Sequence, residues 1–310
     1  MERTVDNLYL IGNGFDIHHN IKCKFSDFHD YLCVHNPMLE NRLFQVYDLH
    51  YGDLWSSLEK NLGIITAESI LGGYVYAPMI FFLERIDGDI TVLNMDDYSE
   101  TVGEIGYTLT RLYTDLKYEF SRWASQLNNA DIKQRVIIEK NKSSFISFNY
   151  TRTLEYIYSI DSSDILYIHG CAERNDDLFF GHNMTSARLL NNWEDNYSIE
   201  ELDTLLQASE EMAILYKDVK SIIDKNELYW ESIKSAKKIR VWGLSLSEVD
   251  VPYIEHINSI LNDKCIEWEF SWFLESDRNR IHEIVRKCQI QNYSLITLNE
   301  LTLPSYKGGE

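Results

Sequence analysis

Short runs of apolar residues, each closed by glycine or polar residues, recur along the chain. The first run, at 7–11 (NLYLI), is mostly apolar and ends at Gly12. A nearly continuous run of this length is typical of a strand that is buried on both faces in a parallel sheet. Comparable runs predict further strands at 144–148, 165–168, 239–242, 266–272 and 293–298, with a short candidate at 178–180.

Apolar residues also recur at helical spacing between these runs. Leu109, Leu112, Leu116 and Phe120 fall on one face of a helix. Local apolar patterns and capping signals predict further helices at 26–34, 251–261 and 278–288. Two longer segments are predicted to be mainly helical, at 38–135 and 185–237.

This alternation of strands with helices indicates a fold class. It is typical of a parallel sheet with helices on both faces. We therefore expect an α/β, doubly wound, mainly parallel Rossmann-like sheet that forms one domain over residues 1–310. The segment 38–135 would be a helical insertion, and 185–237 a second insertion or a cap. Ligands of such folds bind in the crevice beyond the carboxyl ends of the strands.

The charge of the chain narrows the choice of partner. Asp and Glu number 49 against 29 Lys and Arg, so the formal net charge is −20. Because nucleic-acid binding depends on neutralising many phosphates, this balance disfavours a large nucleic-acid footprint. A local pocket for one small phosphate-bearing molecule is still allowed. The charge balance therefore predicts that nucleic acid is not the partner, and it leaves a small-molecule nucleotide possible.

The cysteines and the apolar runs bear on the compartment. The five cysteines are odd in number and no two have CxxC spacing, which favours neither a disulfide framework nor a zinc site. No signal-peptide pattern opens the sequence. The longest apolar run, at 74–83, has about half the length that a membrane-spanning helix needs. These features predict a cytoplasmic protein that binds no metal and no membrane.

Residues able to bind or react follow several of the predicted strands. Gly12-Asn13-Gly14 follows the first strand, where glycines permit a tight turn and let a phosphate approach the backbone. As a GxGxxG pattern it is incomplete, since Ile17 takes the third glycine position. A plain strand-to-loop turn is the alternative interpretation.

Later strand ends carry an amide, an imidazole and a hydroxyl. Asn149 could orient a water or a ribose hydroxyl, or cap the helix that follows it. His169 could act as a general base or be a core histidine, and Gly181-His182-Asn183 repeats its pattern. Ser245 and Asp250 could bind a ribose or adenine, or cap the next helix.

Taken together, these segments resemble a known family. LIGNGFDIHHNIKCKFSDF, then FNYTRTLEYIY, YIHG, FGHN and GLSLSEVD resemble, in this order, the motifs of the AbiH family of bacterial abortive-infection proteins. Trp55 and Glu59 resemble its internal Trp-x-x-x-Glu motif. The resemblance runs from about Leu8 to Asp250 and implies a role in defence against phage.

The AbiH family is in turn similar to the sirtuin-like NAD-binding fold. There, a glycine loop binds the pyrophosphate, and Asn-Tyr-Asp and His-Gly stretches supply a catalytic Asn and His. The similarity implies Asn149 and His169 as the catalytic pair. The residues it implies for binding NAD are Gly12, Asn13, Gly14, Phe15, Asp16, Glu59, Thr151, His182, Ser245 and Asp250.

This sequence departs from the sirtuin pattern in three respects. Thr151 stands where sirtuins commonly have Asp, and Asn20 stands where Gly is usual in both groups. Asn is the next best residue for left-handed backbone. The paired CxxC motifs of the deacetylase zinc module are missing, which counts against a deacetylase. The function implied is cleavage of the nicotinamide–ribose bond of NAD, with NAD as substrate or ligand.

Three other functions are compatible with these residues. The chain could be a nucleotide-binding sensor in which His169 is dispensable. It could be a nuclease active during infection, with metal ligands drawn from Asp16, His18, His19, Glu59 and His182. The helical segments 38–135 and 185–237 could dock a defence partner protein or form a homo-oligomer.

Overall fold

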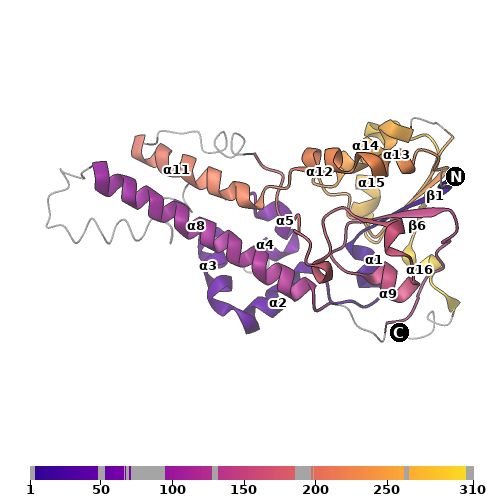
Figure 1. The fold of residues 1–310 in the computed structure, drawn as a ribbon, viewed down its shortest axis with the longest axis horizontal. Coiled ribbons are helices and arrows are strands. Elements are labelled where there is room, and N and C mark those ends of the chain that lie inside the picture. The colour runs from indigo at the N-terminus through magenta and orange to yellow at the C-terminus, as the bar shows by residue number, and fades with distance from the viewer. Residues whose placement is uncertain are drawn as a thin grey trace. The chain divides into compact units, whose positions relative to one another are not determined.

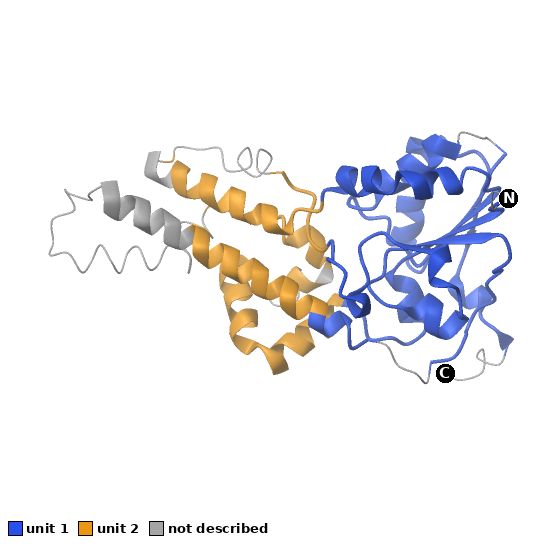
Figure 2. Ribbon diagram, in the orientation of Figure 1, with its two compact units in different colours: residues 1–24, 122–179, 218–310 blue, residues 25–121, 180–217 orange. Residues whose placement is uncertain are grey.

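The chain folds into two compact units. The computed structural model describes residues 4–47, 53–65, 67, 70, 95–127, 132–185, 197, 199–261 and 265–304. Figure 2 colours unit 1, which comprises 1–24, 122–179 and 218–310, and unit 2, which comprises 25–121 and 180–217. The apolar run at 74–83 lies outside the described residues.

Unit 1 is built on a six-stranded sheet in which every neighbouring pair is parallel. The strands are β1 (Asn7–Ile11), β2 (Ser143–Ser147), β3 (Ile165–Tyr167), β4 (Lys238–Trp242), β5 (Glu267–Ser271) and β6 (Tyr293–Ile296). Their order is β3-β2-β1-β4-β5-β6. This is the Rossmann order, in which the chain reverses its direction across the sheet between β1 and β4. The predicted fold class is confirmed.

The short strand predicted at 178–180 is wrong. Leu178 and Phe180 have buried side chains, but they belong to no described strand and pair with none. The backbone N–H of Phe179 donates to the carbonyl of His169 at 3.0 Å, which is an isolated contact rather than part of a ladder. Burial alone therefore explains this apolar run.

Both faces of the sheet are buried, which explains the apolar strands. Leu8 and Leu10 of β1 belong to one hydrophobic cluster, whereas Tyr9 and Ile11 belong to another. Figure 1 shows helices on the two sides of the sheet. On one side they are α12 (Val219–Lys225), α13 (Glu227–Ser232), α14 (Val251–Leu261) and α15 (Glu275–Lys287). On the other they are α1 (Asn13–His18), α9 (Thr153–Tyr158) and α16 (Leu298–Leu301). Two 3₁₀ turns, at Ser162–Asp164 and Ala172–Arg174, flank β3.

The glycines after β1 pack against the glycine after β4. The N–H of Gly12 donates to the carbonyl of Trp242 at 2.9 Å, and that of Gly14 donates to the carbonyl of Gly243 at 2.7 Å. A Cβ added to Gly12 would lie 2.6 Å from the carbonyl oxygen of Gly243. Gly243 itself has φ of +67°, and its Cβ would lie 2.1 Å from the nitrogen of Phe15. Close packing of two loops therefore requires these three glycines.

Replacing Gly243 with alanine should lower the free energy of unfolding by about 2 kcal/mol, because the new Cβ meets backbone in a left-handed conformation. The shift can be measured as a lower urea midpoint. Gly106→Ala is the control. It lies inside a helix, where its Cβ meets the flexible side chain of Gln207, so the midpoint should stay level or rise. A Gly243→Ala midpoint equal to the wild type would contradict this packing argument.

Unit 2 is helical throughout its described elements. These are α2 (Phe25–His35), α3 (Pro37–Tyr47), α4 (Asp53–Ser56), α5 (Leu58–Asn61), α8 (Met95–Ala124), α11 (Ile199–Glu211) and a 3₁₀ turn at Met212–Leu215. The periodic residues of α8, from Leu109 to Phe120, are buried as their spacing predicts. Among the described helices of the chain, none is long and apolar enough to cross a membrane.

Candidate functional site

The carboxyl ends of β1 and β2 bring Asp16 and Asn149 together. Asp16 lies in α1, which begins directly after Gly12, and its side chain is fully buried. Asn149 follows β2 by two residues and is 5% exposed. Its Nδ2 donates to the carbonyl oxygen of Gly12 at 3.1 Å. Two residues from separate motifs of the sequence therefore lie at one point of the sheet edge.

Within the described part of the chain, one oxygen of each side chain lacks a hydrogen bond. Thr151 Oγ1 donates to Oδ2 of Asp16 at 2.5 Å, which joins a third predicted site residue to the pair. Asp16 Oδ1 and Asn149 Oδ1 are buried, and neither has a hydrogen-bond partner in the described part of the chain. Buried polar atoms are nearly always paired, so these two orphaned acceptors, one from each of two motifs, mark a place where a hydrogen-bond donor would fit.

Burial also changes the acidity of this group. Desolvation raises the pKa of Asp16 to about 6, while the polar side chains of Thr151, Thr153 and Asn149 act in the opposite direction. At neutral pH the side chain is a carboxylate held out of water. Its charge is compensated by hydrogen bonds rather than by a described basic residue. Such a group can accept a hydrogen bond from a hydroxyl or stabilise a developing positive charge.

Two residues of the glycine loop have structural roles. The side chain of Asn13 donates through Nδ2 to the carbonyl of Cys23 at 2.9 Å, so it holds the segment after α1. Phe15 is fully buried and packs on Trp242 in the hydrophobic core. Asn20 has φ of 62°, so the left-handed backbone argued for an asparagine at this position is confirmed. Binding of a nucleotide by this loop stays a prediction.

His169 lies at the end of the neighbouring strand, in an aromatic surrounding. It is 2% exposed, and its Nε2 lies 3.2 Å from the hydroxyl of Tyr253 on α14. Its ring contacts Phe148 edge-on, with centroids 5.4 Å apart, and lies 6.3 Å from the ring of Tyr150. The residues on both sides of Asn149 along the chain therefore flank His169.

Ser245 and Asp250 interact with one another in the loop before α14. Asp250 Oδ2 accepts from Ser247 Oγ at 3.1 Å and from Ser245 Oγ at 3.5 Å. The carbonyl of Ser245 accepts from Arg280 Nη1 at 3.0 Å. These contacts shape the loop at the end of β4, and Asp250 directly precedes α14, as a capping residue does.

Glu59 and His182 belong to unit 2, where Lys217 connects them. Lys217 Nζ donates to Glu59 Oε1 at 2.9 Å, and the N–H of Lys217 donates to the carbonyl of His182 at 2.7 Å. The Lys217 side chain is 1% exposed, which is exceptional for a lysine. Nothing in the sequence singles it out, because a lysine that follows the apolar run 212–216 and precedes Asp218 gives no signal of its own burial.

Glu59→Gln should lower the free energy of unfolding by about 2 kcal/mol, because it leaves the buried ammonium of Lys217 unpaired. A fully buried pair would cost about 3–5 kcal/mol, and the loss is smaller here because the Glu59 side chain is 21% exposed. The double variant Glu59→Gln with Lys217→Met removes both charges and should recover part of the loss. Equal urea midpoints for all three proteins would show that the pair contributes nothing.

The histidines considered as metal ligands are engaged within the protein. The two ring nitrogens of His19 contact the carbonyl of Phe15 at 2.7 Å and the hydroxyl of Tyr158 at 2.6 Å. Those of His182 contact the carbonyl of Met212 and the N–H of Met184, both at 3.1 Å. Burial lowers the pKa of each histidine to about 4, so both are neutral at pH 7. Their contacts are those of structural histidines.

Comparison with known proteins identifies one family. The family described as "Bacteriophage abortive infection AbiH" matches residues 8–272, a range that includes every predicted site residue from Gly12 to Asp250. No curated protein and no solved structure matches the chain. The similarity to the sirtuin-like fold stays a prediction.

Proposed function

The chain belongs to the AbiH family of bacteriophage abortive infection proteins, and we propose that unit 1 serves this role by binding NAD and cleaving its nicotinamide–ribose bond. The family membership supplies the role in phage defence. The choice of NAD rests on the arrangement at the carboxyl edge of a Rossmann-ordered sheet, where dinucleotides bind in other proteins.

The observation that carries this proposal is the buried pair of orphaned oxygens. Asp16 Oδ1 and Asn149 Oδ1 lie beside β1, next to which the order of the strands reverses. Neither atom has a hydrogen-bond partner among the described residues. Both are acceptors, so they suit a ligand that offers hydroxyl donors. A ribose has such hydroxyls, and a water held there for attack also donates.

The chemistry fits a site with one carboxylate, one amide and one imidazole. Cleavage breaks the bond between the ribose carbon and the nicotinamide nitrogen, and the electron pair goes to the cationic ring, which leaves as a neutral molecule. The leaving group therefore needs no general acid, unlike the two-carboxylate arrangement of most sugar hydrolases. Water forms the new carbon–oxygen bond, and its proton passes to His169. Asn149 would orient the ribose or the water, and the Asp16 carboxylate would stabilise the positive charge that develops on the sugar.

One observation favours a second candidate, a nucleotide sensor without catalysis. His169 is 2% exposed and its Nε2 already contacts the hydroxyl of Tyr253. A general base must reach the proton that it removes. If that contact persists in the bound state, Asp16 and Asn149 would bind the nucleotide and His169 would support the fold.

The experiment that separates these functions measures nicotinamide release from NAD by the purified full chain. On the same samples, thermal melting is recorded with NAD and with ADP-ribose. Release of nicotinamide, with stabilisation by ADP-ribose, is the result expected for a glycohydrolase. Stabilisation without release would overturn cleavage and select the sensor. If nicotinamide is not released and neither nucleotide stabilises the protein, the proposal of a nucleotide site is itself overturned.

A further inference from the structure

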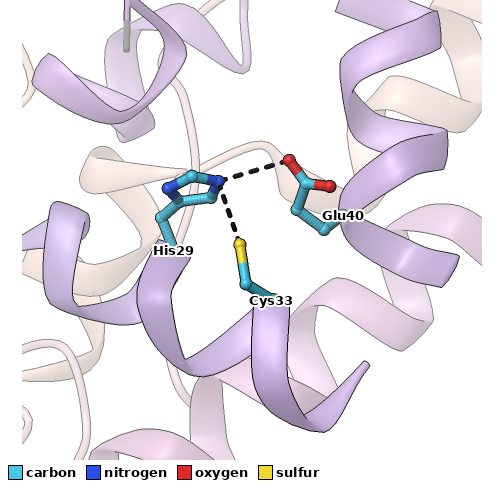
Figure 3. Close-up of side chains that lie close together, drawn as sticks. All are labelled: His29, Cys33 and Glu40. Atoms are coloured by element: carbon cyan, nitrogen blue, oxygen red, sulfur yellow. Dashed lines mark hydrogen bonds and ion pairs between the residues drawn. The ribbon is translucent and has the colours of Figure 1, made fainter. Parts of the chain in front are cut away.

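Three groups that bind transition metals converge in unit 2, outside the site described above. They are His29 and Cys33 on α2 and Glu40 on α3 (Figure 3). One ligand atom from each lies within 4.8 Å of the others. His29 Nε2 lies 3.2 Å from Glu40 Oε1 and 3.4 Å from Cys33 Sγ.

The local sequence explains why these side chains meet. His29 and Cys33 are four residues apart in one helix, so they share a face. Asn36 connects α2 to α3, and its Oδ1 accepts from the N–H of Leu39 at 3.1 Å, which fixes the start of α3 one turn before Glu40. The ring of His29 stacks on Trp55, with centroids 4.7 Å apart and planes inclined by 26°. The imidazole is therefore held in one orientation.

The geometry does not suit a catalytic triad built on a cysteine. In such a triad the carboxylate and the sulfur contact opposite nitrogens of the ring, so that one orients the histidine and the other gives up its proton. Here both contact Nε2. A ring nitrogen carries at most one hydrogen, so the sulfur and the carboxylate compete for a single position. A cation placed among the three atoms would satisfy all of them at once.

We propose that His29, Cys33 and Glu40 bind a zinc ion. With bonds of about 2.0 Å to nitrogen and oxygen and about 2.3 Å to sulfur, a tetrahedral ion would hold nitrogen and oxygen about 3.3 Å apart and nitrogen and sulfur about 3.5 Å apart. The measured separations are 3.2 and 3.4 Å. The ligand set therefore needs only small adjustments to close on the ion.

The donor chemistry selects the metal. Imidazole with thiolate suits zinc, whereas magnesium and calcium prefer oxygen ligands alone. Binding releases the thiol proton of Cys33 to solvent, and the thiolate and the Glu40 carboxylate then neutralise the two positive charges of the ion. His29 is buried and Cys33 is exposed, so solvent can reach the fourth position of the ion. The site bridges α2 and α3, and it does not depend on the function proposed for unit 1.

Cysteine spacing alone did not predict this site. The lack of CxxC pairs counts against zinc, whereas the signal for it lies in a His-x-x-x-Cys pair on one helix and a glutamate seven residues later. The pair resembles in spacing the two histidines, four residues apart, that hold zinc in other helices. The glutamate becomes a ligand only through the turn at Asn36, which spacing does not reveal.

The test is zinc binding by the full chain without a histidine tag. After dialysis against zinc and removal of excess ion, metal analysis should give one zinc per chain in the wild type. Cys33→Ser and Glu40→Gln should weaken zinc affinity by more than about 100-fold, beyond the range of about 10- to 100-fold for loss of an outer partner. Cys265→Ser is the matched control, since Cys265 is also exposed and belongs to unit 1. Its zinc content should equal that of the wild type.

A second readout is independent of variant folding. In the wild type, zinc should slow alkylation of Cys33 at least 10-fold and leave alkylation of Cys265 unchanged, because only the first thiol would be coordinated. Cobalt in place of zinc should add a thiolate-to-metal absorption that Cys33→Ser lacks. A wild-type chain that binds no zinc, or zinc that protects both thiols equally, would overturn the proposal.

Discussion

His169→Ala should lower nicotinamide release from NAD by about 10²- to 10⁴-fold, the range that a positioned acid–base group contributes. Asn149→Ala should lower it by about 10²-fold or more, because the ribose or the water loses its orientation. Their effects on binding should differ. Loss of Asn149 removes a buried acceptor and should also weaken ADP-ribose affinity. Loss of His169 removes only the proton acceptor and should leave that affinity within a few-fold of the wild type. Release and affinity measured on the same samples separate the two roles.

The chain offers matched controls for both variants. Asn258 Nδ2 donates to a backbone carbonyl, that of Cys288 at 2.9 Å, as Asn149 donates to that of Gly12. His282 Nδ1 lies 3.2 Å from the hydroxyl of Tyr293, as His169 lies from that of Tyr253. Asn258→Ala and His282→Ala should therefore retain release within a few-fold. Full release by His169→Ala would show that this histidine is no base, and the sensor would be the better account.

Asp16→Asn should raise the stability of the protein at pH 8 and have no such effect at pH 4. Burial raises the pKa of Asp16 from 3.8 to about 6, so the folded state binds this proton more tightly than the unfolded state. The group therefore destabilises the fold above pH 6, and the penalty disappears as the pH falls from 6 toward 3.8. A shift of about 2 pKa units corresponds to about 3 kcal/mol. The amide oxygen can still accept from Thr151, so the variant loses the charge and keeps that bond.

Urea midpoints of wild type and variant across pH 4 to 8 measure this effect. His19 and His182, whose pKa values are lowered, cost stability as the pH falls below 6.5, but they do so in both proteins and cancel in the difference. Asp6→Asn is the control with opposite sign, because hydrogen bonds from Lys237 and Lys142 lower the pKa of Asp6. The Asp6→Asn substitution should slightly lower the urea midpoint at pH 8. An Asp16→Asn variant no more stable than wild type at pH 8 would contradict the cost assigned to the buried carboxylate.

A stabilised Asp16→Asn variant that no longer binds nucleotide would connect this result to function. Groups kept in place against the stability of the fold are typical of sites where activity requires them. Simple core packing would not lose ligand affinity while gaining stability. The two measurements together therefore bear on why an aspartate stands in a fully buried position.

The strands at the centre of the sheet could be predicted from the sequence because both of their faces are buried, as in β1 and β2. Burial on two sides produces apolar runs that need no periodicity. The predicted bounds of the six strands differ from the observed ones by at most two residues. The helix predicted at 251–261 agrees with α14 at both ends. By contrast, Leu54, Trp55, Leu58 and Leu62 stand at the spacing of one continuous helix. The structure divides this segment into α4 and α5, because the chain leaves helical geometry at Ser57.

The candidate site was only partly predictable, because it depends on contacts between residues that are far apart in the sequence. The sequence predicts that the glycines at 12 and 14 make room for a phosphate. In the structure they pack closely against the backbone of Gly243, about 230 residues later. No local pattern encodes that contact. Lys217 and the group of His29, Cys33 and Glu40 also depend on packing between segments. Asn149 and Asp16 could be selected because each stands directly after a readable strand.

The division of the chain into one domain with two insertions stays a prediction. The compact units begin and end at other residues than the predicted segments, and unit 2 gathers two stretches that are separated by 58 residues of unit 1. The partner protein and the homo-oligomer expected for the helical segments also stay predictions.

The proposed function depends on a nucleotide site at the buried pair of Asp16 and Asn149. Calorimetric titration of ADP-ribose into wild type, Asn149→Ala and Asn258→Ala tests it most directly, because it does not depend on an active catalyst. We predict binding by the wild type and by Asn258→Ala, and at least a 10-fold loss of affinity in folded Asn149→Ala. No binding by the wild type, or equal binding by all three proteins, would contradict the claim.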